Sequence, residues 1–318
     1  MSAHACYRVL NGFSKISIEE GEKMKISRLK SLLFFLPFLL CFALFWLIPV
    51  IFGFWISLNN WNLSSGIHKF VGLQNYINIF TSGNIYNGFF MKGLKNVLIF
   101  VVISVPLLVL IGLILALIVD SLPGKLKPIF RTIFFISYAV SVTAVSAIFL
   151  WLFNGNGGYI NNVLINLGIM SSPINWLNSQ PYAWIALVIT TVWWTIGYNM
   201  ILFVGALNEI DTSLYEAANL DGADFWNRFK SIVYPSIRNI LVFVLLTTTI
   251  ASFNLYGQAK LITGGGPAQG TTTLIMSIEK TVFGMNQLGV GSAMAILMGI
   301  IIVLIALFQM WLTRERDV

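Results

Sequence analysis

The sequence predicts an all-α membrane protein with six transmembrane helices. Of its 318 residues, 57% are hydrophobic and only 10% are charged, whereas an ordinary soluble domain carries about 25% charged residues. A helix needs roughly 20 apolar residues to cross the hydrocarbon core of a bilayer. Six stretches reach that length, over residues 32–58, 94–119, 132–153, 183–207, 239–262 and 288–312.

The placement of basic residues predicts the orientation of these helices. The net charge of +7 could by itself suggest nucleic-acid binding. With the N-terminus inside, however, most of the Lys and Arg residues fall in the cytoplasmic segments, and the external segments hold only Lys69, Lys92, Lys95, Lys260 and Lys280. This asymmetry follows the positive-inside rule. We therefore expect cytoplasmic N- and C-termini and no nucleic-acid partner.

Residues 1–30 are expected to form a cytoplasmic tail ahead of a transmembrane domain over residues 31–318. Reverse translation of residues 19–22 gives a purine-rich run that resembles a ribosome-binding site a few codons before Met24. The natural chain then starts at Met24, or else the whole tail is translated; the intact mass of the native protein distinguishes the two. The first span is too long for a cleaved signal peptide and lacks a small-residue cleavage site.

The segments between the first four spans contain no further domain. Residues 70–80 are expected to form a short helix along the outer surface. Residues 120–131, with two prolines and a glycine, predict a tight basic turn in the cytoplasm. Residues 154–180 are rich in Asn and Gly and contain no charged residue, so we expect a lid or a docking loop there.

The last three spans carry residues that are unusual for a lipid-facing helix. The fourth contains Trp194, Tyr198 and Asn199, and the fifth contains several hydroxyl and amide side chains over residues 247–258. Because polar groups are costly in the hydrocarbon core, they indicate either a solute pathway or contacts between helices. Small residues over 284–295 permit close helix packing, either at a subunit interface or within the chain.

A polar passage separates the fourth span from the fifth. Ser213 and Glu216 have the spacing of a capping box, which predicts a short first helix. Gly222 supplies a turn, and the apolar residues that follow recur with helical spacing. Pro235 is expected to stop or kink this second helix. A helix pair of this kind either docks on a partner protein or lies on the lipid surface.

The order of residues in this passage resembles the EAA loop in the membrane subunits of binding-protein-dependent ABC importers. The resemblance implies the type I ABC importer permease fold, with a cytoplasmic coupling loop over residues 208–238 that sits in a cleft of an ATPase subunit. Glu216 would contact a basic group of the ATPase, and Gly222 would set the angle between the two helices. The residues implied to form the coupling surface are Leu214, Glu216, Ala217, Ala218, Asp221, Gly222, Ala223, Phe225, Trp226 and Phe229.

A second resemblance lies in the external loop Thr263-Gly264-Gly265-Gly266-Pro267. This loop lacks the spacing and the lysine of a Walker A motif. It resembles the loop of the larger-subunit type of sugar-importer permease, typified by the first membrane subunit of the maltose importer. The resemblance implies that Gly264, Gly265, Gly266 and Pro267 dock an extracytoplasmic solute-binding protein. It also implies a heterodimer with a second permease subunit, two ATPase subunits and a location in the bacterial cytoplasmic membrane.

The same resemblance places a sugar pathway on the fourth and fifth spans. Alignment from Glu216 and Pro235 carries the sugar-contacting positions to Trp194, Thr195, Tyr198, Thr248, Ala251, Ser252 and Leu255. The asparagines of the maltose site correspond to Ser252 and Leu255 here, which argues against maltose itself. Aromatic faces stack on sugar rings and hydroxyl groups exchange hydrogen bonds with them. Ordinary packing between helices is the alternative interpretation of these residues.

The sequence contains no catalytic or metal-binding pattern. His4 and His68 are its only histidines, and no cluster has the spacing of metal ligands. We therefore expect no enzyme activity and no cofactor in this chain, with ATP and Mg²⁺ bound by the partner ATPase subunits. No charged residue lies deep within a span, which disfavours a proton-coupled carrier. A self-sufficient channel or a secondary carrier of another kind remains the alternative function.

Overall fold

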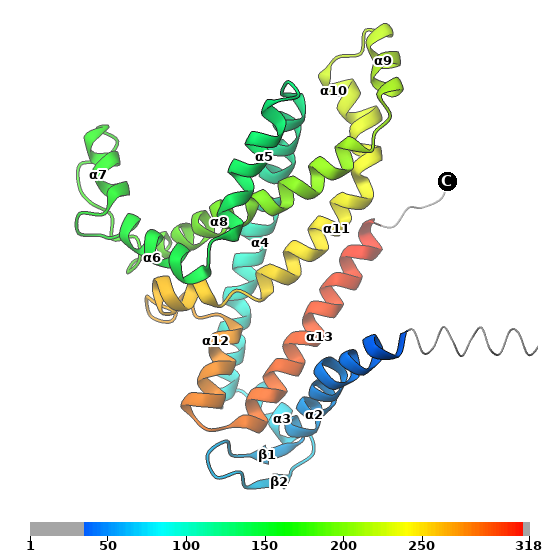
Figure 1. The fold of residues 1–318 in the computed structure, drawn as a ribbon. Coiled ribbons are helices and arrows are strands. Elements are labelled where there is room, and N and C mark those ends of the chain that lie inside the picture. The colour runs from blue at the N-terminus through cyan, green and yellow to red at the C-terminus, as the bar shows by residue number, and fades with distance from the viewer. Residues whose placement is uncertain (1–34, 314–318) are drawn as a thin grey trace, which may run out of the picture. The chain divides into compact units, whose positions relative to one another are not determined.

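A computed structural model describes residues 35–313 of the chain (Figure 1). The expected N-terminal tail, including Met24, lies outside the described residues. The chain divides into two compact units, residues 1–56 and 57–318. In the first unit the described residues are helical from Phe35 onward, and they include the π-helical turn η1 (Ala43–Leu47) and α2 (Ile48–Ser57). Together they form an apolar helix of 23 residues, as predicted for the first span.

Four long helices dominate the second unit: α4 (Ile85–Ser121), α8 (Tyr182–Asn208), α11 (Tyr234–Phe253) and α13 (Leu288–Thr313). Helix α4 packs along both α8 and α11, and α13 packs against α11. A buried cluster that includes Leu113, Phe203 and Val244 joins the first three of these helices. The predicted second, fourth and last spans are therefore confirmed as helices, although α4, at 37 residues, is longer than expected.

The predicted third span is not one straight helix. Its residues form α5 (Leu126–Ile136), the short 3₁₀ turn η2 (Ser137–Ala139) and α6 (Val142–Leu152), and the two arms meet at 94°. The bend arises because Val140 and Ser141 are extended and the Ser141 hydroxyl caps α6, accepting a hydrogen bond from the Ala144 N–H at 3.3 Å. The described residues thus contain five long apolar helices, or six when this bent pair counts as one span.

The predicted fifth span, 239–262, is displaced toward the N-terminus. Helix α11 ends at Phe253, and a separate π-helical turn, η4 (Ala259–Thr263), follows. At its other end α11 continues directly from α10 (Phe225–Arg228) and the π-helical turn η3 (Phe229–Val233). Of the two expected outcomes at Pro235, a stop or a kink, the stop is therefore wrong. The Tyr234 N–H bonds to the Phe229 carbonyl in the wider π-helical pattern, and this local widening accommodates the proline within a continuous helix.

The remaining elements of the second unit are short, and β1, β2 and α3 lie at the end away from α10 (Figure 1). Strands β1 (Asn59–Trp61) and β2 (His68–Phe70) form an antiparallel hairpin that the sequence analysis did not predict. Helix α3 (Gln74–Phe80) lies within the short helix expected over residues 70–80. Helix α7 (Tyr159–Asn166) lies in the Asn- and Gly-rich stretch, and α12 (Leu274–Glu279) with the π-helical turn η5 (Lys280–Gly284) precedes α13.

The small residues at the start of α13 pack within the chain. A β-carbon at Gly289 would overlap the Asn59 carbonyl oxygen, and one at Gly291 would overlap the Val282 side chain. Ala293 is fully buried. Of the two interpretations that the sequence left open, packing within the chain therefore applies to these positions.

Candidate functional site

The bend between α5 and α6 creates one wall of a cavity. The backbone of α8 approaches the bend so closely that a β-carbon at Gly197 would overlap the Phe134 carbonyl oxygen. The Trp194 indole N–H donates to the Val140 carbonyl at 2.9 Å, and the Ser137 hydroxyl donates to the Trp194 carbonyl at 3.3 Å. A glycine on α8 and two hydrogen bonds thus hold the bend against the middle of α8.

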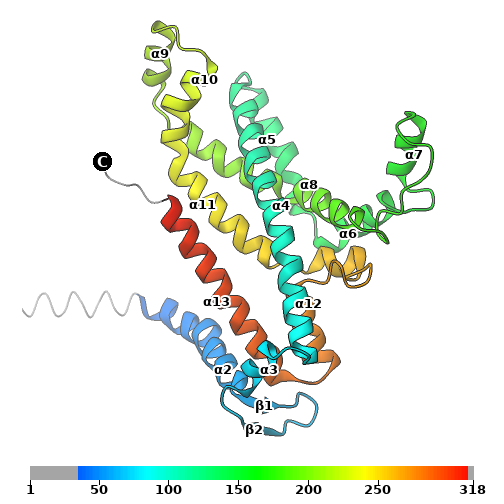
Figure 2. The ribbon, with the colours of Figure 1, turned by 180° about the vertical axis from the view of Figure 1, so that it is seen from behind.

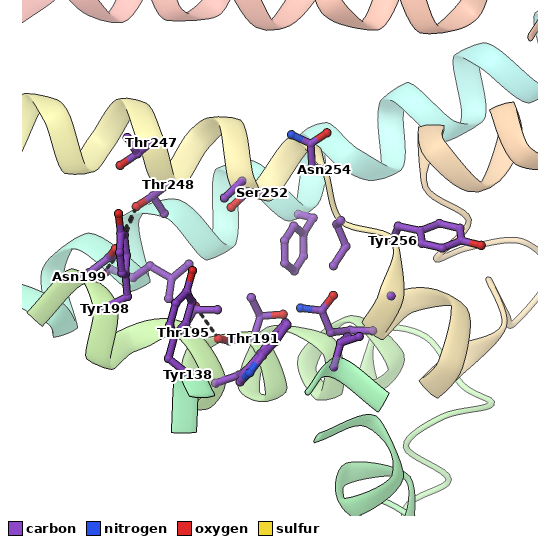
Figure 3. A pocket seen from close by; sticks show the side chains of 18 residues that line it. Tyr138, Thr191, Thr195, Tyr198, Asn199, Thr247, Thr248, Ser252, Asn254 and Tyr256 are labelled. Carbon is purple, nitrogen blue, oxygen red and sulfur yellow. Dashed lines mark hydrogen bonds between the residues drawn. The ribbon is translucent and has the colours of Figure 1, made fainter. Parts of the chain in front are cut away.

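The cavity lies between this bend, α8 and the last turns of α11, and its volume is about 500 Å³ (Figure 3). All seven residues that the sequence assigned to a solute pathway line it: Trp194, Thr195, Tyr198, Thr248, Ala251, Ser252 and Leu255. The structure therefore brings the predicted residues together around one space. Their contact with a solute stays a prediction.

The cavity has further lining residues that the sequence analysis did not assign to the pathway. They are Phe100, Leu108, Tyr138, Val142, Thr191, Asn199, Thr247, Asn254, Tyr256, Gly257 and Gln258. Asn199 and the polar residues over 247–258 had been noted as polar residues in apolar spans, with a solute pathway and helix contacts as the two interpretations. Tyr138 could not be found in this way, because it reaches the cavity only through the bend in the third span.

Hydroxyl, amide and aromatic groups supply all the polar chemistry of the cavity. None of its lining residues carries a formal charge. The rings of Tyr138 and Tyr198 stack with their centroids 5.1 Å apart. The Thr195 hydroxyl donates to the Thr191 carbonyl in its own helix, and the Ser252 hydroxyl lies 3.3 Å from that of Ser104. Such a surface suits an uncharged, hydroxyl-rich solute better than an ion, whose burial without a paired charge is costly.

The predicted coupling loop forms two short helices, α9 (Thr212–Leu220) and α10, at the end of the second unit opposite β1 and β2 (Figures 1 and 2). The predicted capping box is wrong, because α9 begins one residue before Ser213. Asp211 is the N-cap instead, and its carboxylate accepts a hydrogen bond from the Ser213 N–H at 2.9 Å. This hydrogen bond lowers the pKa of Asp211, because it favours the charged form of the carboxylate.

The turn between α9 and α10 follows the prediction. Gly222 has φ +66°, a conformation that residues with a β-carbon rarely adopt. The Ala223 N–H donates to the Ala218 carbonyl at 2.9 Å and closes the end of α9. Across the turn, the Arg228 guanidinium donates to the Asn219 side chain at 3.0 Å. The two helices are thus held as one unit.

The predicted coupling residues differ in exposure. Glu216, Ala217, Asp221 and Gly222 are exposed, whereas Ala218 and Ala223 are half-buried. Leu214, Phe225 and Trp226 are large apolar side chains with 48%, 64% and 66% of their surface exposed. Phe229 instead packs against the core cluster that joins α4, α8 and α11. Leu220, which the sequence analysis did not single out, is 91% exposed.

The glycine loop, which the sequence analysis expected on the external side, is largely held by its own chain. Gly264 and Gly265 have positive φ, and the Gly265 carbonyl accepts from the Thr271 N–H at 3.1 Å. Gly265 is buried, Gly266 and Pro267 are half-buried, and only Gly264 of the four predicted docking residues is exposed. Helix α4 anchors the loop, because the Asn96 amide donates to the carbonyls of Gln269 and Thr272 at 3.0 and 2.9 Å.

Comparison with known proteins identifies the family. Residues 109–317 match the family described as "Binding-protein-dependent transport system inner membrane component". The chain belongs to this family. It is therefore a permease, the pore-forming membrane component of a binding-protein-dependent importer, and not a self-sufficient channel or a secondary carrier. The family is one of transport components and not of catalysts. Among the described residues, no group of three His, Cys, Asp or Glu side chains is placed to hold a metal ion.

Relatives of this permease cover nearly its full length. It is 31% identical over 279 residues to the probable ABC transporter permease protein YurN of Bacillus subtilis, with 87% of this chain and 94% of the relative covered. It is 30% identical to the lactose transport system permease protein LacF of Rhizobium radiobacter, with 89% and 94% covered. It is 32% identical to the trehalose/maltose transport system permease protein MalF of Thermococcus litoralis, with 89% and 93% covered.

A solved structure supports the fold of the permease. A chain of a bacterial ABC transporter involved in the import of the acidic polysaccharide alginate superposes with a TM-score of 0.78, at 19% identity. The match covers 94% of this chain and 100% of that chain. The predicted type I ABC importer permease fold is therefore confirmed.

Proposed function

We propose that this permease conducts an uncharged sugar or oligosaccharide through the cavity between α8 and α11. The observation that carries the proposal is that all seven expected pathway residues line one cavity whose lining holds no formal charge. The relatives that transport lactose and trehalose/maltose support a saccharide as the solute. Tyrosine and tryptophan faces would stack on sugar rings, and the Thr248 and Ser252 hydroxyls would exchange hydrogen bonds with sugar hydroxyls.

Energy would reach the cavity through α10 and α11. These helices are continuous from Phe225 to Phe253, so the exposed coupling end and the cavity residues Thr248 and Ser252 belong to one rigid element. ATP, bound with Mg²⁺ on two separate ATPase subunits, would close those subunits and move the α9–α10 pair. The attached helices would then switch the cavity between the two sides of the membrane. Both termini would lie on the ATPase side.

The coupling surface of this proposal is the exposed part of α9 and α10. Among the described residues, the Glu216 carboxylate forms no hydrogen bond or ion pair, which leaves it available for a basic group of the ATPase. Leu214, Phe225 and Trp226 would fill the ATPase cleft, and removing apolar surface of this size from water favours docking. A second, different permease subunit would complete the pathway, and an extracytoplasmic binding protein would deliver the solute.

An affinity pull-down from the native membrane tests the assembly. The tagged wild-type chain should recover an ATPase, a second permease and a solute-binding protein. Glu216→Ala should weaken recovery of the ATPase, whereas Glu209→Ala, which removes an exposed carboxylate outside the motif, should not. Recovery of this chain alone, with transport in liposomes that lack ATP, would overturn the proposal.

Uptake by the reconstituted complex tests the solute class. We expect ATP-dependent uptake of neutral di- and oligosaccharides and at least tenfold slower uptake of uronic-acid oligosaccharides of equal length. Comparable uptake of the two kinds would show that the uncharged cavity does not select the solute.

A further inference from the structure

A second cavity, of about 340 Å³, lies beside the external glycine loop. Its lining comes from α4, η4, the glycine loop, α12 and η5, and it includes Phe89, Lys280, Phe283 and the ion pair of Lys260 with Glu279. It shares no lining residue with the cavity between α8 and α11. Under the function proposed above, on which this inference rests, this cavity lies on the outer side of the membrane.

The outer segments of the permease are basic. Residues 59–95, 154–181 and 260–287 contain five lysines and a single acidic residue, Glu279. The Glu279 carboxylate is already used, because it lies 2.8 Å from the Lys260 ammonium. The hydrogen bond from Lys260 to Glu279 raises the pKa of Lys260, as expected for a cation held by a carboxylate. The outer face therefore carries positive charge that nothing in these segments balances.

Lys280 carries such a charge at the second cavity. It is exposed, and its ammonium group lies 4.7 Å from the centre of the Phe89 ring. The one carboxylate among the residues that line this cavity, that of Glu279, is paired with Lys260. Beside it, Phe283 has 70% of its surface exposed. An exposed aromatic ring beside a cavity offers a large apolar area that a partner can bury.

The glycine loop itself offers less to a partner. Three of its four predicted docking residues are buried or half-buried. The Lys92 ammonium donates to the Ala268 carbonyl at 2.9 Å, and Asn96 holds two further carbonyls. These contacts fix the loop against α4, so it forms one wall of the second cavity, and Lys280 and Phe283 are exposed beside it.

We propose that the second cavity receives an acidic side chain of the extracytoplasmic solute-binding protein. The carboxylate pairs with Lys280, and a neighbouring apolar residue of the binding protein covers Phe283. The centre of docking thus lies on η5 and not on the four residues of the glycine loop. Opposite charges across such an interface accelerate association and fix its register.

The test measures the affinity of the purified, fluorescently labelled solute-binding protein, identified in the pull-down above, for the complete importer in nanodiscs. Lys280→Glu should weaken binding at least tenfold in 50 mM salt, and less in 500 mM salt because salt screens the pair. Lys69→Glu, the same charge reversal at an exposed residue of β2, should change binding less than twofold. Phe283→Ala should weaken binding at both salt concentrations.

Exchanging the two charges between the importer and the binding protein tests whether Lys280 pairs with a carboxylate of the binding protein. Replacing the responsible acidic residue of the binding protein by lysine should restore binding to the Lys280→Glu importer, whose assembly with the ATPase is checked by gel filtration. Wild-type affinity in Lys280→Glu would overturn the inference while the importer function stands. A loss of bound anionic lipid without a loss of binding-protein affinity would assign Lys280 to lipid headgroups and also overturn it. If the wild-type importer itself binds no solute-binding protein, the result overturns the proposed function and, with it, this inference.

Discussion

The Asn199 amide and the Thr248 hydroxyl lie 3.1 Å apart between α8 and α11, at the edge of the central cavity (Figure 3). The same amide lies 3.4 Å from the Leu108 carbonyl of α4. Asn199 and Thr248 are both buried. One side chain therefore connects the three helices that form the core of the second unit. Because a buried polar group without a partner is costly, this contact fixes how the helices that carry the cavity lie against one another.

Thr248→Val should loosen this junction. Valine has nearly the same shape as threonine but leaves the Asn199 amide without its partner on α11. We expect a loss of about 1 kcal/mol of stability and reduced uptake by the reconstituted importer. Thr248→Ser keeps the hydroxyl group and should retain most of the stability and most of the uptake. Thermal unfolding of the purified complex measures the effect, and an unchanged melting temperature in Thr248→Val would contradict the assigned role.

Gly197 and Gly205 offer a matched pair of substitutions on α8. A β-carbon at Gly197 would overlap the Phe134 carbonyl oxygen, whereas one at Gly205 meets nothing within 4 Å. Gly197→Ala should push α8 away from the α5–α6 bend, at a cost of about 1–3 kcal/mol, and should separate Tyr198 from Tyr138. Gly205→Ala should be neutral or stabilising by up to about 1 kcal/mol, because alanine favours the helix. Melting temperatures and uptake rates of the two variants check this contrast, and equal effects would refute the close approach.

Hydropathy was sufficient to predict the long apolar helices but not how the third span bends. The bend depends on a hydroxyl cap at Ser141 and on a hydrogen bond from Trp194, more than fifty residues away in the chain. No local pattern contains the second of these contacts. For the same reason Tyr138 was missed as a cavity residue, whereas Trp194 and Tyr198, on a straight helix, were predicted. Pro235 shows the converse, because a strong local rule for a helix stop was overridden by a π-helical turn.

At the candidate sites, residue type was easier to predict than exposure. The coupling passage was found from its motif, yet the motif assigned Phe229 to a docking face, and the structure packs this ring against the core. Conversely, Leu220 is almost fully exposed, although nothing in its apolar type distinguishes it from a buried leucine. Exposure depends on how α9 and α10 lie against the rest of the chain, and that arrangement is a tertiary property.

The Asp211 cap should stabilise the first turn of α9 equally at all pH values near neutrality. The folded-state pKa of Asp211 lies below the usual value of 3.8, because the charged carboxylate accepts a hydrogen bond from Ser213. A group whose pKa is lower in the folded state than in the unfolded state contributes stability that is fully present above its unfolded-state pKa. This stability is lost as the pH falls through its folded-state pKa. Asp211→Ala should therefore speed amide hydrogen exchange in the first turn of α9 equally at pH 7.5 and pH 5.5. Asp211→Asn, which can still cap the helix, is the control, and protection that changes between these two pH values in the wild type would contradict the assignment.

Substitutions at Trp226 and Phe229 should distinguish an effect on coupling to the ATPase from an effect on stability. Their rings stack with centroids 5.7 Å apart, but Trp226 is 66% exposed whereas Phe229 packs on the core. Trp226→Ala should leave the melting temperature nearly unchanged and reduce ATP-dependent uptake, because an aromatic anchor at an interface carries much of its binding energy. Phe229→Ala should instead destabilise the chain by about 1–3 kcal/mol, since it removes contacts with the helices below. If Trp226→Ala lowers stability as much as Phe229→Ala while ATPase binding is kept, the exposed face of α10 is not the coupling surface.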